Sequence, residues 1–383
     1  MDLASMDLDR RSFLTLLGAA AAAPTLARAA GARVVVTDVI GRTVELAGPV
    51  GRIVLLDARD VISMALLHPD PSLLVVGWAD VARLDSDLLR RRYETRPDGS
   101  LIAEVGGQTP DTLSVEHILS LTPDLVVASA FMVPELGEGR LVGQLAAAGI
   151  PVVFSNAASN AAPPAGAAGD PIGDMGRAMR MWGEVLGVPA RARTFTDFVA
   201  DRLARVTGRL AGVAPTRAYL EVQSTYDDCC WAAGQRIWGD LLRLAGGSTL
   251  SAIEASWYVK LPIEQLMTEA PAVYIASGGA YGGDIRPGIA PGLDPAAARA
   301  GLARLVARTG FETLPAVRDG RVHGVWTGLL TVAPLNILFV EIAATWLHPA
   351  LFADLDPAAT LDEIGRRFLA DPLPGPCWVS LVG

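Results

Sequence analysis

The chain has 383 residues, of which 51% are hydrophobic and 19% are charged, and its formal net charge at pH 7 is −9. This length suffices for two domains with sizeable cores, because domains typically contain about 100–200 residues. An acidic chain without a basic block lacks the charge pattern of proteins that bind nucleic-acid phosphates. Three cysteines are too few for a disulfide scaffold, and four scattered histidines do not form a histidine-rich metal site.

The amino terminus is typical of a bacterial export signal. Arg10-Arg11 precede Ser12-Phe13-Leu14 and an alanine-rich apolar stretch that is too short to span a membrane. The paired arginines resemble the twin-arginine signal, and Ala27-Arg28-Ala29 is a candidate cleavage site. We predict a signal peptide over residues 1–29 and export to the periplasm, the alternative being an alanine-rich helix that stays attached. Beyond it, no run reaches the roughly 20 uncharged apolar residues of a membrane span.

Short apolar runs and helical stretches alternate along the rest of the chain, which predicts an α/β fold with largely parallel sheets. The expected strands, in chain order, are residues 34–36, 44–46, 53–56, 73–76, 125–128, 152–154, 218–222, 273–276 and 322–326. The expected helices are residues 60–67, 114–121, 140–148, 172–186, 191–210, 237–244, 263–268, 295–308, 335–347 and 361–369.

The composition divides the chain into parts. Residues 156–169 are rich in Ala, Pro, Gly and Asn, which is typical of a loop or a boundary. We predict an N-terminal α/β lobe over residues 30–157, a loop and helical linker over 158–211, and a C-terminal α/β lobe over 212–383. A cleft between two such lobes is the expected place for a ligand.

The sequence lacks the common signatures of catalysis and nucleotide binding. It contains no Gly-x-Gly-x-x-Gly turn after a strand, no Walker loop and no Gly-x-Ser-x-Gly elbow. His323 lies in an expected strand beside a turn, so it could approach the cleft, but packing is the favoured role. Cys229-Cys230 could pair as a vicinal disulfide after export, and we expect packing thiols instead. These observations favour a protein that is not an enzyme and holds no cofactor.

Four segments, in order, together resemble one protein family. They are residues 36–54, 113–127, 261–275 and 314–323, and the second runs from a helix through Thr122-Pro123-Asp124 into an apolar strand. Together they resemble the periplasmic substrate-binding proteins of bacterial ABC importers for iron siderophores, haem and cobalamin. The resemblance implies two three-layer α/β lobes with largely parallel sheets, joined by a rigid helical linker, with the ligand between them. It also implies a monomer.

The resemblance further implies that one glutamate in each lobe docks on arginines of the membrane permease. The matching positions are Glu116 and Glu264. Each lies in the first turn of an expected helix, where exposed amide groups stabilise a carboxylate. Capping of the helix is therefore the alternative role, and we expect docking.

Parallel sheets bind ligands beyond the carboxyl ends of their strands. At these ends, and in nearby loops, we expect the following residues to line the cleft: Arg59, Trp78, Phe131, Tyr226, Trp231, Trp257, Tyr258, Tyr281, Arg286 and Trp326. Aromatic faces and a few arginines suit a bulky, partly apolar chelate with some anionic edge. Direct binding of a metal by the protein would require clustered His, Cys or carboxylate groups, which are absent from the pattern.

We therefore predict the solute-binding component of an ABC importer that captures a metal chelate, with a ferric siderophore as the first candidate. Its expected partners are the permease with its ATPase. Haem, cobalamin or another metal chelate is the alternative ligand. An exported cofactor-containing oxidoreductase is the alternative of another class, but Cys229, Cys230 and Cys377 are poorly spaced for cluster ligation. A receptor or sensor domain with this fold would be expected to carry a membrane span.

Overall fold

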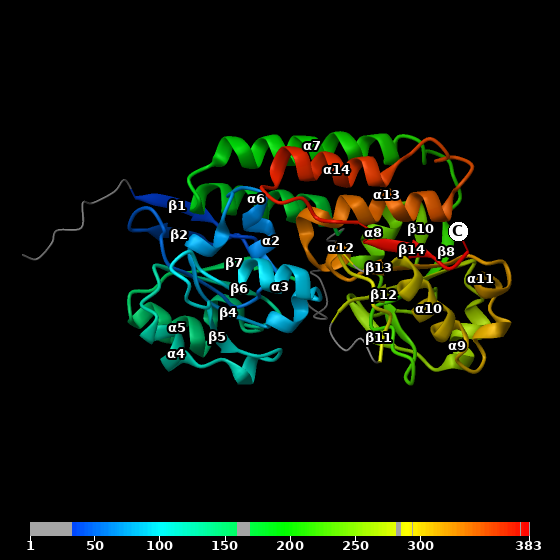
Figure 1. Cartoon of the computed structure of the whole chain (residues 1–383), viewed down its shortest axis with the longest axis horizontal. Helices are drawn as coiled ribbons and strands as arrows, with labels where there is room; N and C mark the ends of the chain where they lie inside the picture. The colour runs from blue at the N-terminus through cyan, green and yellow to red at the C-terminus, as the bar shows by residue number, and fades with distance from the viewer. Residues whose placement is uncertain (1–32, 159–168, 281–284, 293, 376, 383) are drawn as a thin grey trace, which may run out of the picture.

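The structure is a computed structural model of the chain, and it describes residues 33–158, 169–280, 285–292, 294–375 and 377–382. The predicted signal peptide, residues 1–29, lies outside these ranges. Figure 1 shows two lobes side by side beneath a layer of helices. Within the described ranges, no helix combines the length and apolar character needed to cross a membrane.

The N-terminal lobe contains an opening hairpin and a five-stranded parallel sheet. The hairpin pairs β1 (Val34–Thr37) with β2 (Thr43–Leu46), and Arg42 at its turn donates a hydrogen bond of 2.6 Å to the Val152 carbonyl oxygen. The sheet has the order β5-β4-β3-β6-β7. Its strands are β3 (Ile53–Leu55), β4 (Val75–Ala79), β5 (Ala103–Gly106), β6 (Leu125–Ser129) and β7 (Val152–Asn156).

The strands β3, β4 and β6 are buried along their whole length. Parallel strands covered on both faces read as continuous apolar runs, which is why the sequence pattern finds them. Short helices pack around this sheet: α2 (Asp60–Ala65), α3 (Asp87–Tyr93), α4 (Val115–Ser120) and α5 (Arg140–Ala147). Short 3-10 turns in the two lobes are Pro71–Leu73, Val81–Leu84, Pro110–Thr112, Leu136–Glu138, Phe311–Thr313 and Ala333–Leu335.

The C-terminal lobe is built on a seven-stranded mixed sheet. Its path is β11-β9-β8-β12-β13-β14, with β10 paired to β8. The central strands β8, β12 and β13 are parallel, whereas β9, β11 and β14 are antiparallel additions. The strands are β8 (Thr216–Glu221), β9 (Trp231–Ala233), β10 (Gly247–Ser248), β11 (Tyr258–Lys260), β12 (Val273–Gly278), β13 (Val322–Trp326) and β14 (Trp378–Ser380). The helices of this lobe are α8 (Trp238–Leu244), α9 (Ile263–Glu269), α10 (Pro295–Val306), α11 (Pro315–Arg318) and α12 (Gly328–Thr331).

The helical layer over both lobes comes from two distant parts of the chain. Its helices are α6 (Pro171–Val185), α7 (Pro189–Thr207), α13 (Asn336–Leu347) and α14 (Pro357–Phe368). The rings of Phe195 and Phe368 meet edge to face, with centroids 5.0 Å apart. Arg191 donates hydrogen bonds to the carbonyl oxygens of Leu66 (3.0 Å) and Phe368 (2.8 Å), so one side chain joins the N-terminal lobe, α7 and α14.

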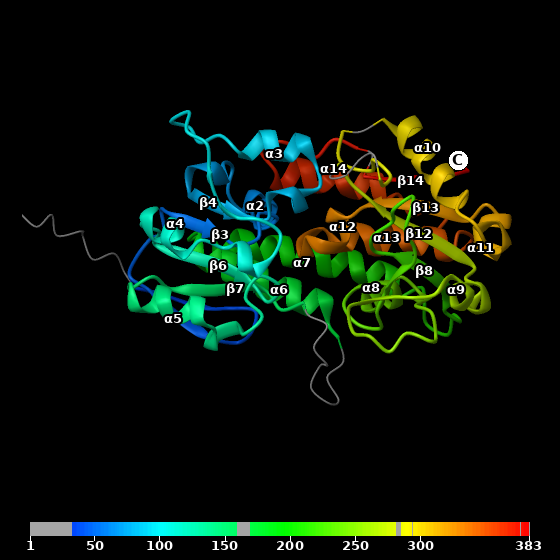
Figure 2. The same cartoon turned by 90° about the horizontal axis from the view of Figure 1, so that it is seen from below.

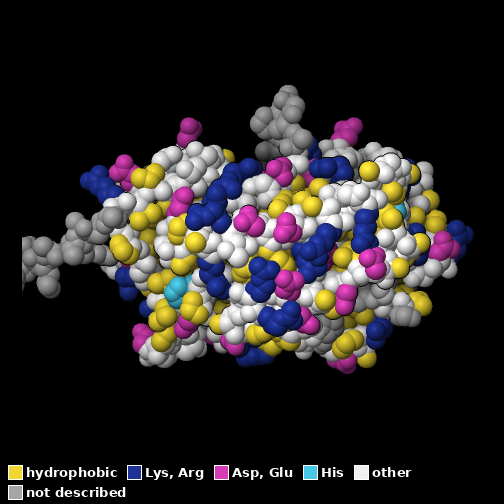
Figure 3. Space-filling model, turned by 90° about the horizontal axis from the view of Figure 1, so that it is seen from above, with side chains coloured by type: hydrophobic (Ala, Val, Ile, Leu, Met, Phe, Trp, Pro, Cys, Tyr) yellow, Lys and Arg dark blue, Asp and Glu magenta, His cyan; other side chains and the backbone are white. Residues whose placement is uncertain are grey.

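The outer surface of this layer carries interspersed charges of both signs (Figure 3). On it, Glu363 pairs with Arg202 at 2.5 Å and with Arg367 at 2.8 Å. Beneath it, α13 is buried on nearly every side, from Asn336 to Ala344. A helix that is apolar all round belongs inside a protein, and here it forms the inner layer beneath α7 and α14.

The fold class predicted from the sequence is confirmed, with two α/β lobes and a helical connection. The short strands β5, β9, β11 and β14 were not predicted, and each has only three or four residues. The expected helices 335–347 and 361–369 exist, but they belong to the shared helical layer. The lobe boundaries at residues 157 and 211 stay a prediction.

Candidate functional site

A cavity of about 490 Å³ lies between the two lobes. It opens beyond Ser129 and Asn156, the last residues of the parallel strands β6 and β7. The N-terminal end of α6, the start of α8 and the α12 segment complete its lining. This volume falls within the range of small-molecule sites, about 300–1,000 Å³, and the position is the one expected for an α/β sheet.

A cluster of aromatic side chains lies at one side of the cavity, with two members in its lining and two behind them, and we call it the aromatic wall: Trp231, Trp238, Trp257 and Tyr258. The Trp257 ring lies 5.6 Å from Trp238 and 5.2 Å from Tyr258, centroid to centroid. Trp231 lies 5.9 Å from Tyr258. The Trp238 indole N–H donates to the Leu330 carbonyl oxygen at 3.2 Å, which fixes that ring against α12. Trp238 and Trp257 line the cavity directly.

Several contacts cross from one lobe to the other. Phe131, in the N-terminal lobe, meets Trp257 edge to face with centroids 6.1 Å apart. On another side, the Asp85 carboxylate lies 3.1 Å from Arg286, and the Asp85 carbonyl oxygen accepts a hydrogen bond from the Trp326 indole at 3.1 Å. Edge-to-face aromatic pairs and partly buried ion pairs both resist separation, so these contacts hold the lobes close together in this structure.

Charged groups gather in the cavity lining, at Asp57 and Arg59, and next to it, at Asp60 and Asp80. Arg59 forms two hydrogen bonds with the Asp57 carboxylate, at 2.8 and 2.6 Å. Burial opposes the ionisation of Asp57, but the charge and hydrogen bonds of Arg59 outweigh it and lower the Asp57 pKa. Burial and the charge of Asp57 raise the pKa of Asp60 to about 8, although the Ser155 hydroxyl donates to Asp60 at 2.6 Å. The same two causes raise the pKa of Asp80 to about 8.

The remaining lining arginines are also paired with carboxylates. Arg236 Nε lies 3.5 Å from Asp240, whose other oxygen lies 3.0 Å from Arg243. Arg177 pairs with Asp174 on α6. Each arginine of the described lining is therefore paired with a carboxylate of this chain, whereas the lining carboxylate Asp170 accepts a hydrogen bond from a backbone amide.

Of the ten residues expected in the cleft, three line this cavity: Arg59, Phe131 and Trp257. Trp231 and Tyr258 belong to the aromatic wall behind it. Both stay close to the cavity because β9 and β11 pair with each other next to it.

Trp78 and Trp326 do not line the described cavity. Trp78 is 1% exposed within the N-terminal sheet, and Trp326 is completely buried. The Arg304 guanidinium covers the Tyr226 ring, with 3.9 Å between the guanidinium carbon and the ring centroid. Arg286 bridges Asp85 and Thr327. These side chains lie outside the cavity because a position at a strand end determines the edge of the sheet at which a residue lies, but not the face to which its side chain points. Tyr281 lies outside the described residues.

The sequence analysis missed several lining residues, namely Asp174, Arg177, Arg236, Trp238 and Asp240. They lie at or just before the starts of α6 and α8. The start of α6 follows the loop over residues 156–169 that was recognised in the sequence. Charged and aromatic residues at those starts were therefore the available signal.

Histidine and cysteine do not supply a metal site in the part of the chain that the structure describes. No group of three or more His, Cys, Asp or Glu side chains suited to a metal ion occurs there. His323 stacks on Trp346 with centroids 4.4 Å apart, and burial lowers its pKa to about 3, so it is a neutral packing residue. Among the described lining residues there is also no His, Tyr, Cys or Met.

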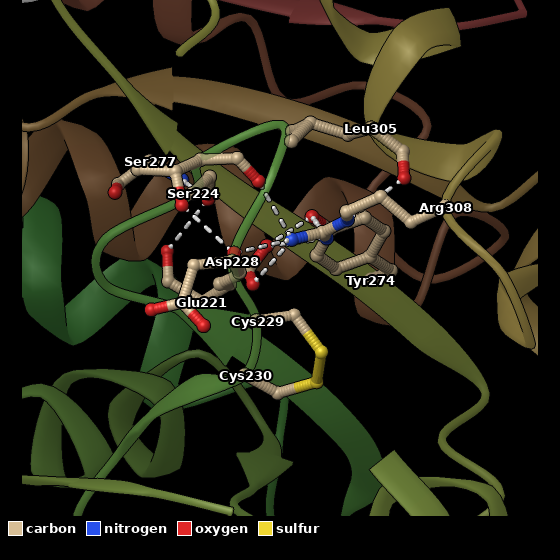
Figure 4. A network of polar contacts seen from close by, with 10 residues as sticks. Glu221, Ser224, Asp228, Cys229, Cys230, Tyr274, Ser277, Leu305 and Arg308 are labelled. Atoms are coloured by element: carbon tan, nitrogen blue, oxygen red, sulfur yellow. Dashed lines mark hydrogen bonds and ion pairs between the residues drawn. A yellow bond between two sulfur atoms is a disulfide. The ribbon is translucent and has the colours of Figure 1, made fainter. Parts of the chain in front are cut away.

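The adjacent cysteines correct one expectation. Cys229 and Cys230 form a vicinal disulfide rather than packing thiols (Figure 4). The disulfide lies at the end of the loop between β8 and β9, just before Trp231 of the aromatic wall. Cys377 is a buried free thiol, and burial raises its pKa to about 12.

Residues 64–325, more than half of the chain, match the family profile described as periplasmic binding protein. The chain belongs to this family. Among solved structures, the TroA-like periplasmic binding protein FepB of Veillonella parvula is similar, with 22% identity, a TM-score of 0.74, and coverage of 91% of this chain and 99% of that one. The comparison with curated proteins gives no match.

Two further solved structures are similar to this chain. A periplasmic heme binding protein of Pseudomonas aeruginosa has 20% identity and a TM-score of 0.56, covering 86% of this chain and 98% of that one. A protein of the ABC-type Fe3+-hydroxamate transport system of Saccharomonospora viridis has 20% identity and a TM-score of 0.56, covering 82% and 98%. At these identities the likeness establishes the fold: two lobes around a cleft.

Proposed function

We propose that this protein is the solute-binding component of an ABC importer and that it captures a metal chelate between its lobes. The observation that carries the proposal is the interlobe cavity of about 490 Å³ with its aromatic wall. In the described part of the chain no three His, Cys, Asp or Glu side chains are grouped so as to hold a metal ion, which supports a metal that arrives already coordinated. The mechanism is capture, slight closure and delivery to a permease, without covalent chemistry.

A ferric siderophore is the first candidate ligand. The names of two structural neighbours, a heme binding protein and a protein of an Fe3+-hydroxamate transport system, indicate that this fold serves iron compounds in more than one form. Haem iron is usually held by a protein side chain such as His, Met, Cys or Tyr. The described lining contains none of these, which favours a siderophore, whose own oxygen atoms fill the coordination sphere of the iron.

The first test is a titration of intrinsic tryptophan fluorescence with ferric siderophores, haem and cobalamin. Trp257 and Trp238 line the cavity, so a bound chelate is expected to quench their emission. Saturable quenching by one ferric siderophore, with free iron silent, supports the proposal, whereas a Soret band in the bound state would identify haem. A flat response to every chelate would contradict the proposal.

Delivery is proposed to proceed through Glu116 and Glu264. Both side chains are exposed, in the first turns of α4 and α9. These helices lie on the side of the molecule opposite α7 and α14, one in each lobe (Figure 1), and far apart along the long axis (Figure 2). Two exposed carboxylates, one on each lobe and both on the same side of the molecule, are suited to meet two basic sites on a membrane partner.

A paired substitution tests this docking role. Glu116→Ala with Glu264→Ala should abolish uptake in cells while leaving chelate binding by the purified protein intact. The matched control, Asp197→Ala with Asp362→Ala, removes two exposed carboxylates from α7 and α14 on the opposite side. Uptake that survives the first pair, or is lost equally with both pairs, would refute docking through these glutamates. Export by the twin-arginine pathway and a monomeric state complete the proposal.

A further inference from the structure

Charged side chains around the interlobe cavity compensate one another within the protein. The described lining contains four carboxylates and three guanidinium groups: Asp57, Asp170, Asp174, Asp240, Arg59, Arg177 and Arg236. Residues 159–168, which interrupt this lining in sequence, consist of Ser, Asn, Ala, Pro and Gly and contribute no charge. The cavity is thus bordered by slightly more negative than positive charge.

Each lining arginine already binds a carboxylate of this chain. Arg59 forms two hydrogen bonds of 2.6 and 2.8 Å with Asp57, and the exposed fractions of the two side chains are 11% and 6%. Arg236 lies 3.5 Å from Asp240. In such pairs the cation is neutralised locally, so an incoming anion would have to displace a carboxylate that remains beside it.

Guanidinium groups next to the lining are compensated as well. Arg83 covers the Phe131 ring at 4.1 Å and lies 3.1 Å from Asp80. Arg243 shares Asp240 at 3.0 Å. These groups therefore add no uncompensated positive charge to the cavity wall.

The remaining source of positive potential is the N-terminal end of α6, a helix of 15 residues. Unpaired amide groups at a helix start favour anions. Here the Asp170 carboxylate accepts a hydrogen bond from the Gly173 amide at 2.8 Å, and Asp174 lies in the first turn. The Asp170 carboxylate thus already accepts from one amide at this end of the helix, and Asp174 places a second negative charge there.

We infer that the cavity accepts an electrically neutral or cationic ferric chelate, of the trihydroxamate class, and discriminates against the trianionic triscatecholate class. The inference rests on the proposed function. In a ferric trihydroxamate, three singly charged ligands cancel the charge of the iron, whereas three doubly charged catecholates leave an excess negative charge. No arginine of the described lining lacks a carboxylate partner, so burying that excess charge there carries an uncompensated desolvation penalty.

This conclusion differs from the anionic edge that the arginines suggested in the sequence. Arg59 faces the cavity but is held by Asp57, and Arg286 is held by Asp85 away from the cavity lining. Residue type predicted the presence of cations near the cleft. The carboxylate partners, which decide the sign of the preferred ligand, become visible only in the fold.

Calorimetric titration of the wild-type protein with a ferric trihydroxamate and a ferric triscatecholate tests the inference. We expect the trihydroxamate to bind at least about a hundredfold more tightly, because like charges brought together at a binding site cost several kcal/mol. Triscatecholate binding of equal or greater strength would overturn the inference and leave the proposed function standing. Failure of both complexes to bind, along with haem and cobalamin, would overturn the proposed function and this inference with it.

Two variants test the stated cause. Asp240→Asn leaves Arg236 and Arg243 without their carboxylate but keeps an oxygen to accept the Ile237 amide hydrogen bond of 3.1 Å. Asp174→Asn removes the carboxylate partner of Arg177 at a half-exposed site, where folding is less sensitive to a substitution. Each should raise the ratio of triscatecholate to trihydroxamate affinity, by about tenfold or more for Asp240→Asn.

The control is Asp356→Asn, which removes the same charge from the N-cap of α14, outside the described cavity lining. It should leave the affinity ratio unchanged. An unchanged ratio in both Asp240→Asn and Asp174→Asn, with melting temperatures near wild type, would refute compensated charge as the basis of discrimination. A shift of the ratio in the control as large as in the variants would refute it too.

Discussion

Arg308 joins three parts of the C-terminal lobe (Figure 4). Its guanidinium donates to both oxygens of Glu221, at 2.9 and 2.8 Å, and to the Tyr274 hydroxyl at 2.9 Å. It also donates to the carbonyl oxygens of Thr225 (3.0 Å) and Asp228 (3.3 Å), in the loop that carries the vicinal disulfide. The side chain of Glu221 is completely buried, and that of Arg308 is 9% exposed.

We predict that Arg308→Met lowers the free energy of unfolding by about 3–5 kcal/mol, the usual effect of leaving a buried charge without its partner. The methionine fills much of the space but offers no donor to Glu221. Glu221→Met combined with Arg308→Met should destabilise less than Arg308→Met alone, because no buried charge is then left unpaired. The control is Arg304→Met in the last turn of α10, just before Arg308, where an exposed guanidinium over Tyr226 contributes only about 0.5–1 kcal/mol.

Urea unfolding of the four proteins, followed by tryptophan fluorescence and circular dichroism with the disulfide kept oxidised, measures these differences. Coincident transitions by the two probes are needed for the comparison. The reasoning fails if Arg308→Met destabilises no more than Arg304→Met. It fails equally if the double variant is less stable than Arg308→Met.

Three further predictions concern pH and the lobe contacts. The pKa of Asp60 is about 8 in the folded protein and 3.8 for an ordinary aspartate. The stability that Asp60 contributes is therefore complete at low pH and is lost as pH rises through 8. Melting temperatures of Asp60→Asn should vary less between pH 4 and 8 than those of the wild type, and an unchanged profile would contradict this prediction. His323 has the opposite pH dependence, because its pKa is about 3 in the folded protein against an ordinary 6.5. Stability is therefore lost as pH falls from 6.5 toward 3. In the same melting assay, His323→Phe should lose less stability on acidification than the wild type. Asp85→Asn weakens the link to Arg286 and should increase the radius of gyration in small-angle scattering; identical curves would count against an interlobe role for this pair.

The sequence predicted those features of the fold that depend on local pattern. The Val126-Val127 run of β6 was found because a strand buried on both faces is continuously apolar. The place of α14 could not be found in this way. It depends on the contact of Phe368 with Phe195, residues far apart in the chain, and the apolar period of a helix does not say which partner covers it.

The candidate site was predicted only in part, for a related reason. The strand-end rule placed Arg59 and Phe131 at the cavity, but it placed Trp78 there as well. In a strand buried on both faces, the alternation that would separate cavity-facing from core-facing side chains is absent. Asp240 was missed because its importance lies in its pairing with Arg236, which only the folded loop and helix bring about.

The interlobe cavity is the proposed binding site of the chelate. Calorimetric titration of the wild type and of Ser256→Trp with the same ferric trihydroxamate tests it most directly, because Ser256 lines the cavity and an indole there would occupy the space. We predict one chelate per chain for the wild type, and no binding by Ser256→Trp at an unchanged melting temperature. Equal affinity in both proteins would show that the chelate binds elsewhere and would contradict binding in the interlobe cavity.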